Sequence, residues 1–222
     1  MHILFEDNHL LVLNKPCGMV TQDTEGHSES LELNAKQYIK KASDKPGNVY
    51  LHAVHRLDTP TSGIVLFAKT SKALSRLQES LSNNLFEKSY VALVQGKLSR
   101  PSAKLEHWLI HGEKQAVVSN KNEKEAKQCL LSYEVLTEIA GNSFVKIILK
   151  TGRYHQIRAQ FSAIFHPIVG DSKYGSKLFF HTDAIALHHI ELTLPHPITK
   201  EKLCITAHLP PFWPQGVKGI SC

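Results

Sequence analysis

The chain has 222 residues, 42% of them hydrophobic and 21% charged, which is typical of a globular protein large enough to bury a core. Its 26 lysines and arginines exceed its 20 acidic residues, so the formal net charge of +6 at pH 7 favours polyanionic partners. The four cysteines form no C-x-x-C pair, the first residues lack a signal-peptide pattern, and no apolar run reaches membrane-spanning length. These features exclude a zinc ribbon, a secreted disulfide scaffold and a membrane protein, and they favour a cytoplasmic location without a membrane partner.

The first half of the chain alternates short apolar runs with helical patterns. Residues 3–6 and 10–13 are apolar on both sides of a polar turn, which predicts a β-hairpin. Residues 31–39 carry apolar side chains at helical spacing. Residues 64–68 form a continuous apolar run, typical of a strand buried on both faces. Residues 74–81 predict a helix, with the Thr-Ser pair at positions 70 and 71 available to cap it.

The second half of the chain is dominated by strand patterns. Strands are predicted at residues 90–94, 131–136, 144–149, 186–194 and 203–207. A second clear helix begins near Tyr154, and the polar, lysine-rich segment 99–128 is expected to form a loop or a hairpin insertion. The sum predicts an α+β fold in one domain of residues 1–222, with a mixed, mostly antiparallel sheet and a few packed helices.

The densest chemical signal is His55-Arg56-Leu57-Asp58, followed by the segment 59–63 immediately before the buried strand. Pro60 and Gly63 restrict the backbone, and the hydroxyls of residues 61 and 62 can bind the loop's own amides. The Asp58 carboxylate would then have the defined geometry that a nucleophile or a base needs. Taken alone, the same residues favour a surface turn in which Arg56 pairs with Asp58.

Four motifs in a fixed order resemble those of RluA-type pseudouridine synthases, and together they are far more specific than any one of them. They are Asn14-Lys15-Pro16-x-Gly18, then His55-Arg56-Leu57-Asp58 with Thr61-Ser62-Gly63, then Lys88-x-Tyr90-x-Ala92-x-Val94-x-Gly96, then Thr151-Gly152-Arg153-x-His155-Gln156-Ile157-Arg158. The later segments Gly170-Asp171 and His196-Pro197 also fit, so the resemblance extends from about residue 10 to residue 210.

The resemblance implies the pseudouridine synthase fold, with a catalytic cleft across the sheet. It also implies an enzyme that isomerises uridines in structured ribosomal RNA, in transfer RNA or in both. The target base is flipped out, its glycosidic bond is broken, and a bond from C5 to C1′ is formed. Asp58 would attack C1′ or the base, or remove a proton from C2′ in a glycal route. The reaction conserves every atom, so we expect no cofactor and no metal.

Three other residues receive roles from the resemblance. Tyr90 would stack on the target base and assist proton removal at C5, and Arg158 would keep the catalytic carboxylate ionised. Arg56 would enter the RNA to displace the nucleotide. Without the motifs, the ordinary alternatives are a half-buried core tyrosine, a solvent-facing helical arginine and an ion-pair partner for Asp58.

A second tier of residues is expected to contact RNA phosphates or to support the pocket: His55, Lys15, Lys88, Arg153 and His155. Gln160 stands where the family commonly has histidine, and we interpret it as a tolerated change in a supporting residue.

The segment 99–128 is the candidate for gripping an RNA stem, with a solvated charged loop as the alternative. Its relevant side chains are Lys104, Trp108, Lys114, Lys121 and Lys124. Because sheet begins at Ile3, we expect a short form of the family, without the N-terminal S4 domain that many relatives carry. We expect a monomer with no obligate protein partner.

Two rival functions remain open at this stage. His52, His55 and Asp58, with His188-His189, could be drawn as ligands of a metal hydrolase. That function would explain neither the Lys88–Gly96 motif nor Arg158, and an arginine between two ligands disfavours a cation. A non-catalytic RNA-binding protein on the same fold is the other rival, for which loss of Asp58 would be expected.

Overall fold

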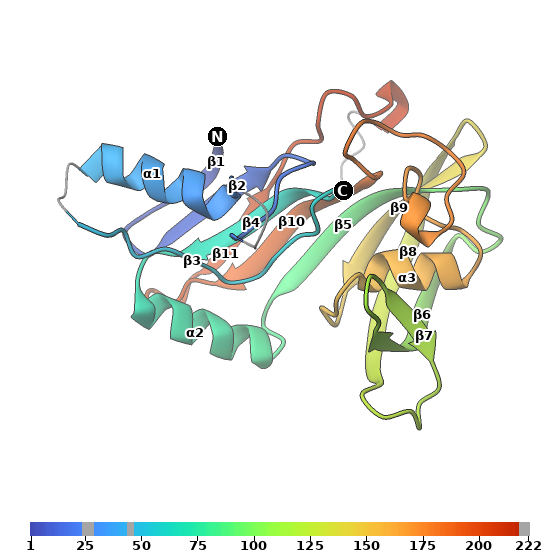
Figure 1. The fold of residues 1–222 in the computed structure, drawn as a ribbon, viewed down its shortest axis with the longest axis horizontal. Helices are drawn as coiled ribbons and strands as arrows, with labels where there is room; N and C mark the ends of the chain where they lie inside the picture. The colour runs from blue at the N-terminus through green and yellow to red at the C-terminus, as the bar shows by residue number, and fades with distance from the viewer. Residues whose placement is uncertain (24–28, 44–46, 218–222) are drawn as a thin grey trace. The chain divides into compact units, whose positions relative to one another are not determined.

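The computed structural model describes residues 1–23, 29–43 and 47–217 (Figure 1). Its strands are β1 (His2–Glu6), β2 (Leu10–Lys15), β3 (His52–Ala53), β4 (Ser62–Ala68), β5 (Glu87–Val94), β6 (Ser102–His111), β7 (Ala116–Ser119), β8 (Lys127–Ile139), β9 (Asn142–Leu149), β10 (Leu187–Pro195) and β11 (Lys202–Thr206). The helices are α1 (Leu31–Ser43), α2 (Ser71–Ser82) and α3 (Gln156–Ala163), with short 3-10 turns η1 (Ser172–Tyr174) and η2 (Gln215–Val217). The predicted α+β class is confirmed, and neighbouring strands such as β1 and β2 or β8 and β9 pair antiparallel.

The chain divides into two compact units. The first comprises residues 1–87 and 189–208, and the second comprises residues 88–188 and the chain from Leu209 onward.

In the first unit, the strands follow the order β1-β2-β4-β10, with β3 beside β4 and β11 beside β10. All seven residues of β4 are buried, as the unbroken apolar run predicts. Ile64, Leu66 and Ala68 belong to the core cluster that includes Ala73 and Leu77 of α2. Side chains alternate along a strand, so the odd-numbered residues of β4 face the other side of the sheet. Figure 1 shows α1 and α2 on opposite sides of this sheet, which agrees with burial of β4 on both faces. The expected cap of α2 is Thr70, whose hydroxyl accepts from the Ala73 N–H.

In the second unit, the strands follow the order β5-β9-β8-β6-β7. The turn between β8 and β9 is Ala140-Gly141, with φ of 49° and 78°, and two left-handed residues match the right-handed twist of a hairpin. The segment 99–128 contains the hairpin β6–β7, so the hairpin alternative for it is confirmed. Helix α3 packs on this hairpin through a cluster of Leu109, Ala116, Cys129, Ala159 and Tyr174.

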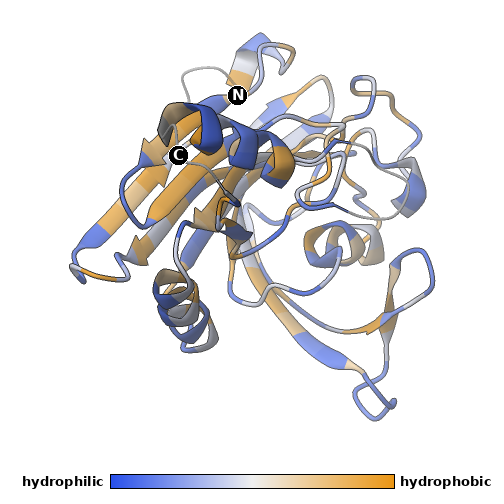
Figure 2. Cartoon of the chain, turned by 60° about the vertical axis from the view of Figure 1, so that its left-hand side comes forward, coloured by the Kyte–Doolittle hydropathy of each residue, from blue (hydrophilic) through white to orange (hydrophobic). Residues whose placement is uncertain are grey.

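The distribution of hydropathy follows this packing. In Figure 2 the strands are mostly orange, whereas the helices show blue residues beside orange ones. Among the residues that the structure describes, no helix combines the length and apolar character needed to cross a membrane.

The turn between β1 and β2 is held by the Asp7 side chain. Its Oδ1 accepts from the backbone N–H of His9 and Leu10, each at 2.7 Å, and its Oδ2 lies 2.8 Å from His196 Nε2. His196 Nδ1 accepts from the Thr199 N–H at 3.1 Å, which leaves Nε2 to carry the ring hydrogen toward Asp7. Burial raises the pKa of the Asp7 carboxyl, but these hydrogen bonds outweigh burial and hold it below the ordinary 3.8.

We predict that Asp7→Ala lowers the free energy of unfolding by about 1–2 kcal/mol at neutral pH, because the turn amides and His196 lose their acceptor. A carboxyl with a lowered pKa stabilises the fold above its unfolded pKa, and this contribution disappears as pH falls through the folded value. The difference between wild type and variant in urea unfolding should therefore shrink below about pH 4. A difference independent of pH would contradict the assignment.

Candidate active site

The Asp58 loop is fixed in the first unit by hydrogen bonds on both sides of the carboxylate. Before it, the Thr21 hydroxyl accepts from the Leu57 N–H and donates to the Leu57 carbonyl, both at 3.1 Å. After it, the Thr61 N–H donates to the Asp58 carbonyl at 3.0 Å and closes a turn. Arg56 is exposed and Asp58 is half-buried, so the loop presents both side chains from a restrained backbone.

Lys15 supports the same loop from within the core of the first unit. Its side chain is completely buried, and its Nζ donates to the carbonyls of Pro16, Met19 and Thr59 at 2.9, 2.7 and 3.1 Å. Burial lowers the pKa of Lys15 to about 8, against the opposing effects of Cys17 and Asp58. Because an ammonium group has three donors, this geometry favours support of the loop over phosphate binding, the other role expected for Lys15.

The approach of β4 to β10 requires glycine at position 63. A Cβ atom there would lie 2.3 Å from the His189 carbonyl oxygen, and Gly63 has φ of 116°. His55 lies on the same side, where its Nε2 accepts from the Leu66 N–H at 3.3 Å and its ring meets His189 edge-on. The sequence expectation that the Thr61 hydroxyl ties the loop is wrong, because that buried oxygen has no hydrogen-bond partner among the described residues.

The second unit holds the remaining candidate residues on β5 and at the start of α3. Lys88 and Tyr90 lie two positions apart on β5, opposite Leu149 and Ile147 of β9, and both are buried. Burial lowers the pKa of the Lys88 amine. A Cβ added at Gly152 would lie 3.3 Å from this amine, so the glycine lets the chain pass close to Lys88. The backbone N–H of Arg153, whose side chain is exposed, donates to Gln156 at 3.0 Å.

Arg158 forms a buried, two-point ion pair. Its Nε and Nη2 donate to Oδ2 and Oδ1 of Asp171 at 2.6 and 2.9 Å. The side chains of Arg158 and Asp171 are only 5% and 1% exposed, which excludes the solvent-facing alternative. The Tyr174 ring lies under the guanidinium, 5.0 Å from its central carbon.

His155 and Gln160 also have structural partners in the second unit. His155 precedes α3 with φ of 50°, and its Nδ1 lies 3.0 Å from the Tyr174 hydroxyl. Gln160 is fully buried, and its Nε2 donates to the carbonyls of Leu105 and Cys129 at 3.2 and 3.1 Å. Gln160 thus joins α3 to β6 and β8, which fits the supporting role expected for it.

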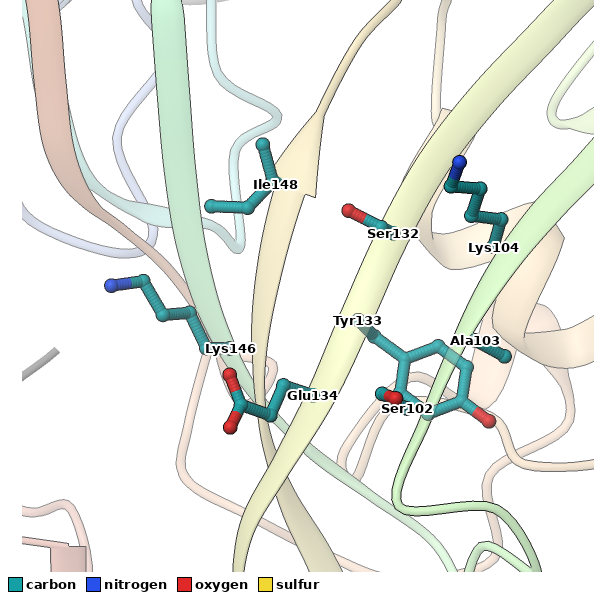
Figure 3. A pocket seen from close by; sticks show the side chains of 8 residues that line it. All are labelled: Ser102, Ala103, Lys104, Ser132, Tyr133, Glu134, Lys146 and Ile148. Atoms are coloured by element: carbon teal, nitrogen blue, oxygen red, sulfur yellow. The ribbon is translucent and has the colours of Figure 1, made fainter.

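A hollow of about 470 Å³ lies on the sheet of the second unit (Figure 3). Its lining comprises Ser102, Ala103, Lys104, Ser132, Tyr133, Glu134, Lys146 and Ile148. The strand register places Lys104 opposite Ser132 and Ser132 opposite Ile148, so these three form one row across β6, β8 and β9. The hollow contains none of the predicted catalytic residues.

The structure thus gathers Lys15, His55, Arg56 and Asp58 in the first unit, and the other predicted site residues in the second. Sequence reasoning missed Thr21, because nothing near Leu57 signals a partner 36 positions away. It also missed the pairing of Asp171 with Arg158, although the Gly170-Asp171 segment matches a family motif and was a usable signal. In the described part of the chain, no three histidine, cysteine or acidic side chains are grouped to hold a metal ion. The ligand set of the rival hydrolase is therefore not assembled there.

The family model for RNA pseudouridylate synthase matches residues 9–163. The chain belongs to this family. A tRNA pseudouridine synthase C from Haemophilus influenzae is 32% identical, over 97% of this chain and 95% of the relative. A ribosomal large subunit pseudouridine synthase D from Zymomonas mobilis is 33% identical, over 95% of this chain and 69% of the relative. These matches agree with the RluA-type motifs, and the chain is a pseudouridine synthase.

The fold of this synthase matches solved structures of the family. The human RNA Pseudouridylate Synthase Domain Containing 4 has a TM-score of 0.80 at 22% identity, over 95% of this chain and 89% of that chain. At this level of identity, the likeness concerns the fold alone.

We predict that Asp171→Ala destabilises the synthase by about 3–5 kcal/mol, because it removes the carboxylate that accepts two hydrogen bonds from the buried Arg158 guanidinium. Urea unfolding measures the loss. The matched control is Glu138→Ala, which breaks the exposed 2.6 Å pair with Lys97 and should cost less than about 1 kcal/mol. Equal losses in the two variants would show that the Arg158–Asp171 pair contributes no more than a surface pair.

Proposed function

We propose that this synthase isomerises specific uridines in structured ribosomal or transfer RNA, or in both, with Asp58 as its catalytic carboxylate. The observation that carries the proposal is the Asp58 loop, held by Thr21 on one side and by Lys15 on the other. A carboxylate that attacks a carbon or removes a proton needs fixed geometry, and the hydrogen bonds to the backbone on both sides of Asp58 restrain this loop. The relatives named for transfer RNA and for the large ribosomal subunit support the two substrate classes.

The family's chemistry requires the target uridine to leave its stack before its glycosidic bond breaks. In this proposal, Arg56 fills the space that the flipped nucleotide leaves, which its exposed side chain allows. Asp58 then acts on C1′, on the base or on the C2′ proton, and the freed uracil rotates until C5 faces C1′. Bond formation at C5 and loss of its proton complete the isomerisation.

Tyr90 and Arg158 act on the same uridine in this proposal. Tyr90 stacks on the base and assists the removal of the C5 proton, roles that suit an aromatic ring with a hydroxyl group. Asp171 holds the Arg158 guanidinium in place through Nε and Nη2, and the role we assign to Arg158 is to keep the catalytic carboxylate ionised. Lys88, Arg153 and His155 are assigned to support or to phosphate contacts, and exposed Arg153 suits the phosphate role best.

Mapping of pseudouridine in cellular RNA with and without the gene tests the substrate class. The proposal expects at least one uridine in ribosomal or transfer RNA to lose its modification, and the purified synthase to restore it. Loss confined to another class of RNA would overturn the substrate assignment.

We predict that Asp58→Asn reduces turnover by at least about a thousandfold, while the stability and RNA affinity of the protein stay close to wild type, because an amide is neither nucleophile nor base. Release of tritium from RNA labelled at uridine C5 measures turnover, and RNA affinity is measured separately. Substantial tritium release from the variant would remove Asp58 from the mechanism.

We predict that Tyr90→Phe keeps RNA affinity but slows product formation by about 10- to 100-fold, because the ring still stacks while the hydroxyl is lost. Single-turnover kinetics separate product formation from binding. Tyr90→Leu is the matched comparison and should weaken binding as well, since it also removes the ring. Wild-type rates in Tyr90→Phe would leave only the stacking role.

A further inference from the structure

Three aromatic rings from two segments of the second unit form one continuous stack. Tyr154 and His155 lie 3.8 Å apart with 19° between their planes, and His111 at the end of β6 lies 4.3 Å from Tyr154 with 28° between planes. Two rings at these distances cannot share one face of Tyr154, so Tyr154 lies between the two histidines. The outer face of His111 therefore ends the stack.

The base of this stack is anchored in the core, whereas its tip is open. His155 is 8% exposed, and its Nδ1 lies 3.0 Å from the hydroxyl of buried Tyr174. That hydroxyl accepts from the Ala116 N–H at 2.8 Å, which fixes the strand paired with His111. Tyr154 is 38% exposed and His111 is exposed. A ligand that stacks on His111 would thus meet a ring already held in place, which lowers the entropy cost of binding.

The surroundings of the stack suit a nucleic acid. Arg153 directly precedes Tyr154, and the Lys173 amine donates to the Lys114 carbonyl at 3.2 Å, in the turn that follows His111. Exposed aromatic rings among lysines and arginines are the combination that binds unpaired bases by stacking and the backbone by charge.

We propose that the exposed face of His111 stacks an unpaired RNA base other than the target uridine and so helps to hold the RNA strand. The proposal rests on the proposed function, which assigns the target base itself to Asp58 and Tyr90. A base bound in this way carries no reacting atom, so His111 contributes to RNA affinity and not to the chemical step. The β6–β7 hairpin thereby gains a specific role within the segment expected to grip RNA.

The test measures binding of the intact synthase to the RNA stem-loop that contains the uridine mapped in cells. His111→Ala should weaken this affinity about tenfold and leave turnover at saturating RNA unchanged. His111→Phe should restore the affinity, because a ring is what the base requires. The matched control is His181→Ala, since exposed His181 likewise stacks on an aromatic ring, Phe212, at 4.1 Å in the same unit.

Stem-loops with a single abasic nucleotide identify the stacked base. At one loop position other than the target, removal of the base should weaken binding to wild type about tenfold and have no effect on binding to His111→Ala. Additive losses at every loop position, or wild-type affinity in His111→Ala, would overturn the proposal. The tritium assay on the wild-type synthase tests the proposed function separately. If that function were wrong, the wild-type protein would release no tritium from any RNA uridine, whatever the result of the His111 binding measurements.

Discussion

The buried ion pair between Arg158 and Asp171 is the interaction on which the second unit's candidate site depends. A guanidinium that is only 5% exposed requires a counter-charge, because burying an unpaired charge costs several kcal/mol. Asp171 supplies that charge through two hydrogen bonds and so fixes the start of α3 relative to η1. Tyr174 lies against both Arg158 and His155, so the same arrangement positions the aromatic stack that ends at His111.

The first unit also contains a buried cation that holds parts of the chain together. Lys15 is completely buried, and three backbone carbonyls replace its water, so the amine joins the end of β2 to the loop of Asp58. In both units a buried positive charge is therefore used for rigidity. The residues left exposed, Arg56 and Arg153, are the ones suited to reach RNA.

Much of the fold was predictable because its signals are local. The hairpin of β1 and β2, the doubly buried β4 and the Thr70 cap of α2 each follow from residues that are adjacent or one helical turn apart. The support of the site was less predictable. The hydroxyl that fixes Leu57 comes from Thr21 and not from Thr61, because chain folding brings Thr21 to the loop from 36 positions away while the Thr61 hydroxyl is buried without a partner among the described residues.

The sequence by itself determined the family and the fold class, and it named the residues proposed for the chemistry, since motifs record residue types and their order. Only the tertiary structure decided how those residues are held. In the folded chain Arg158 pairs with Asp171, and the Lys15 amine binds backbone carbonyls inside the first unit. His111 stacks on Tyr154, which lies 43 positions away along the chain. These contacts join segments that are remote in sequence, and the free energy of burying charges and rings together selects them. No pattern within either segment records that choice.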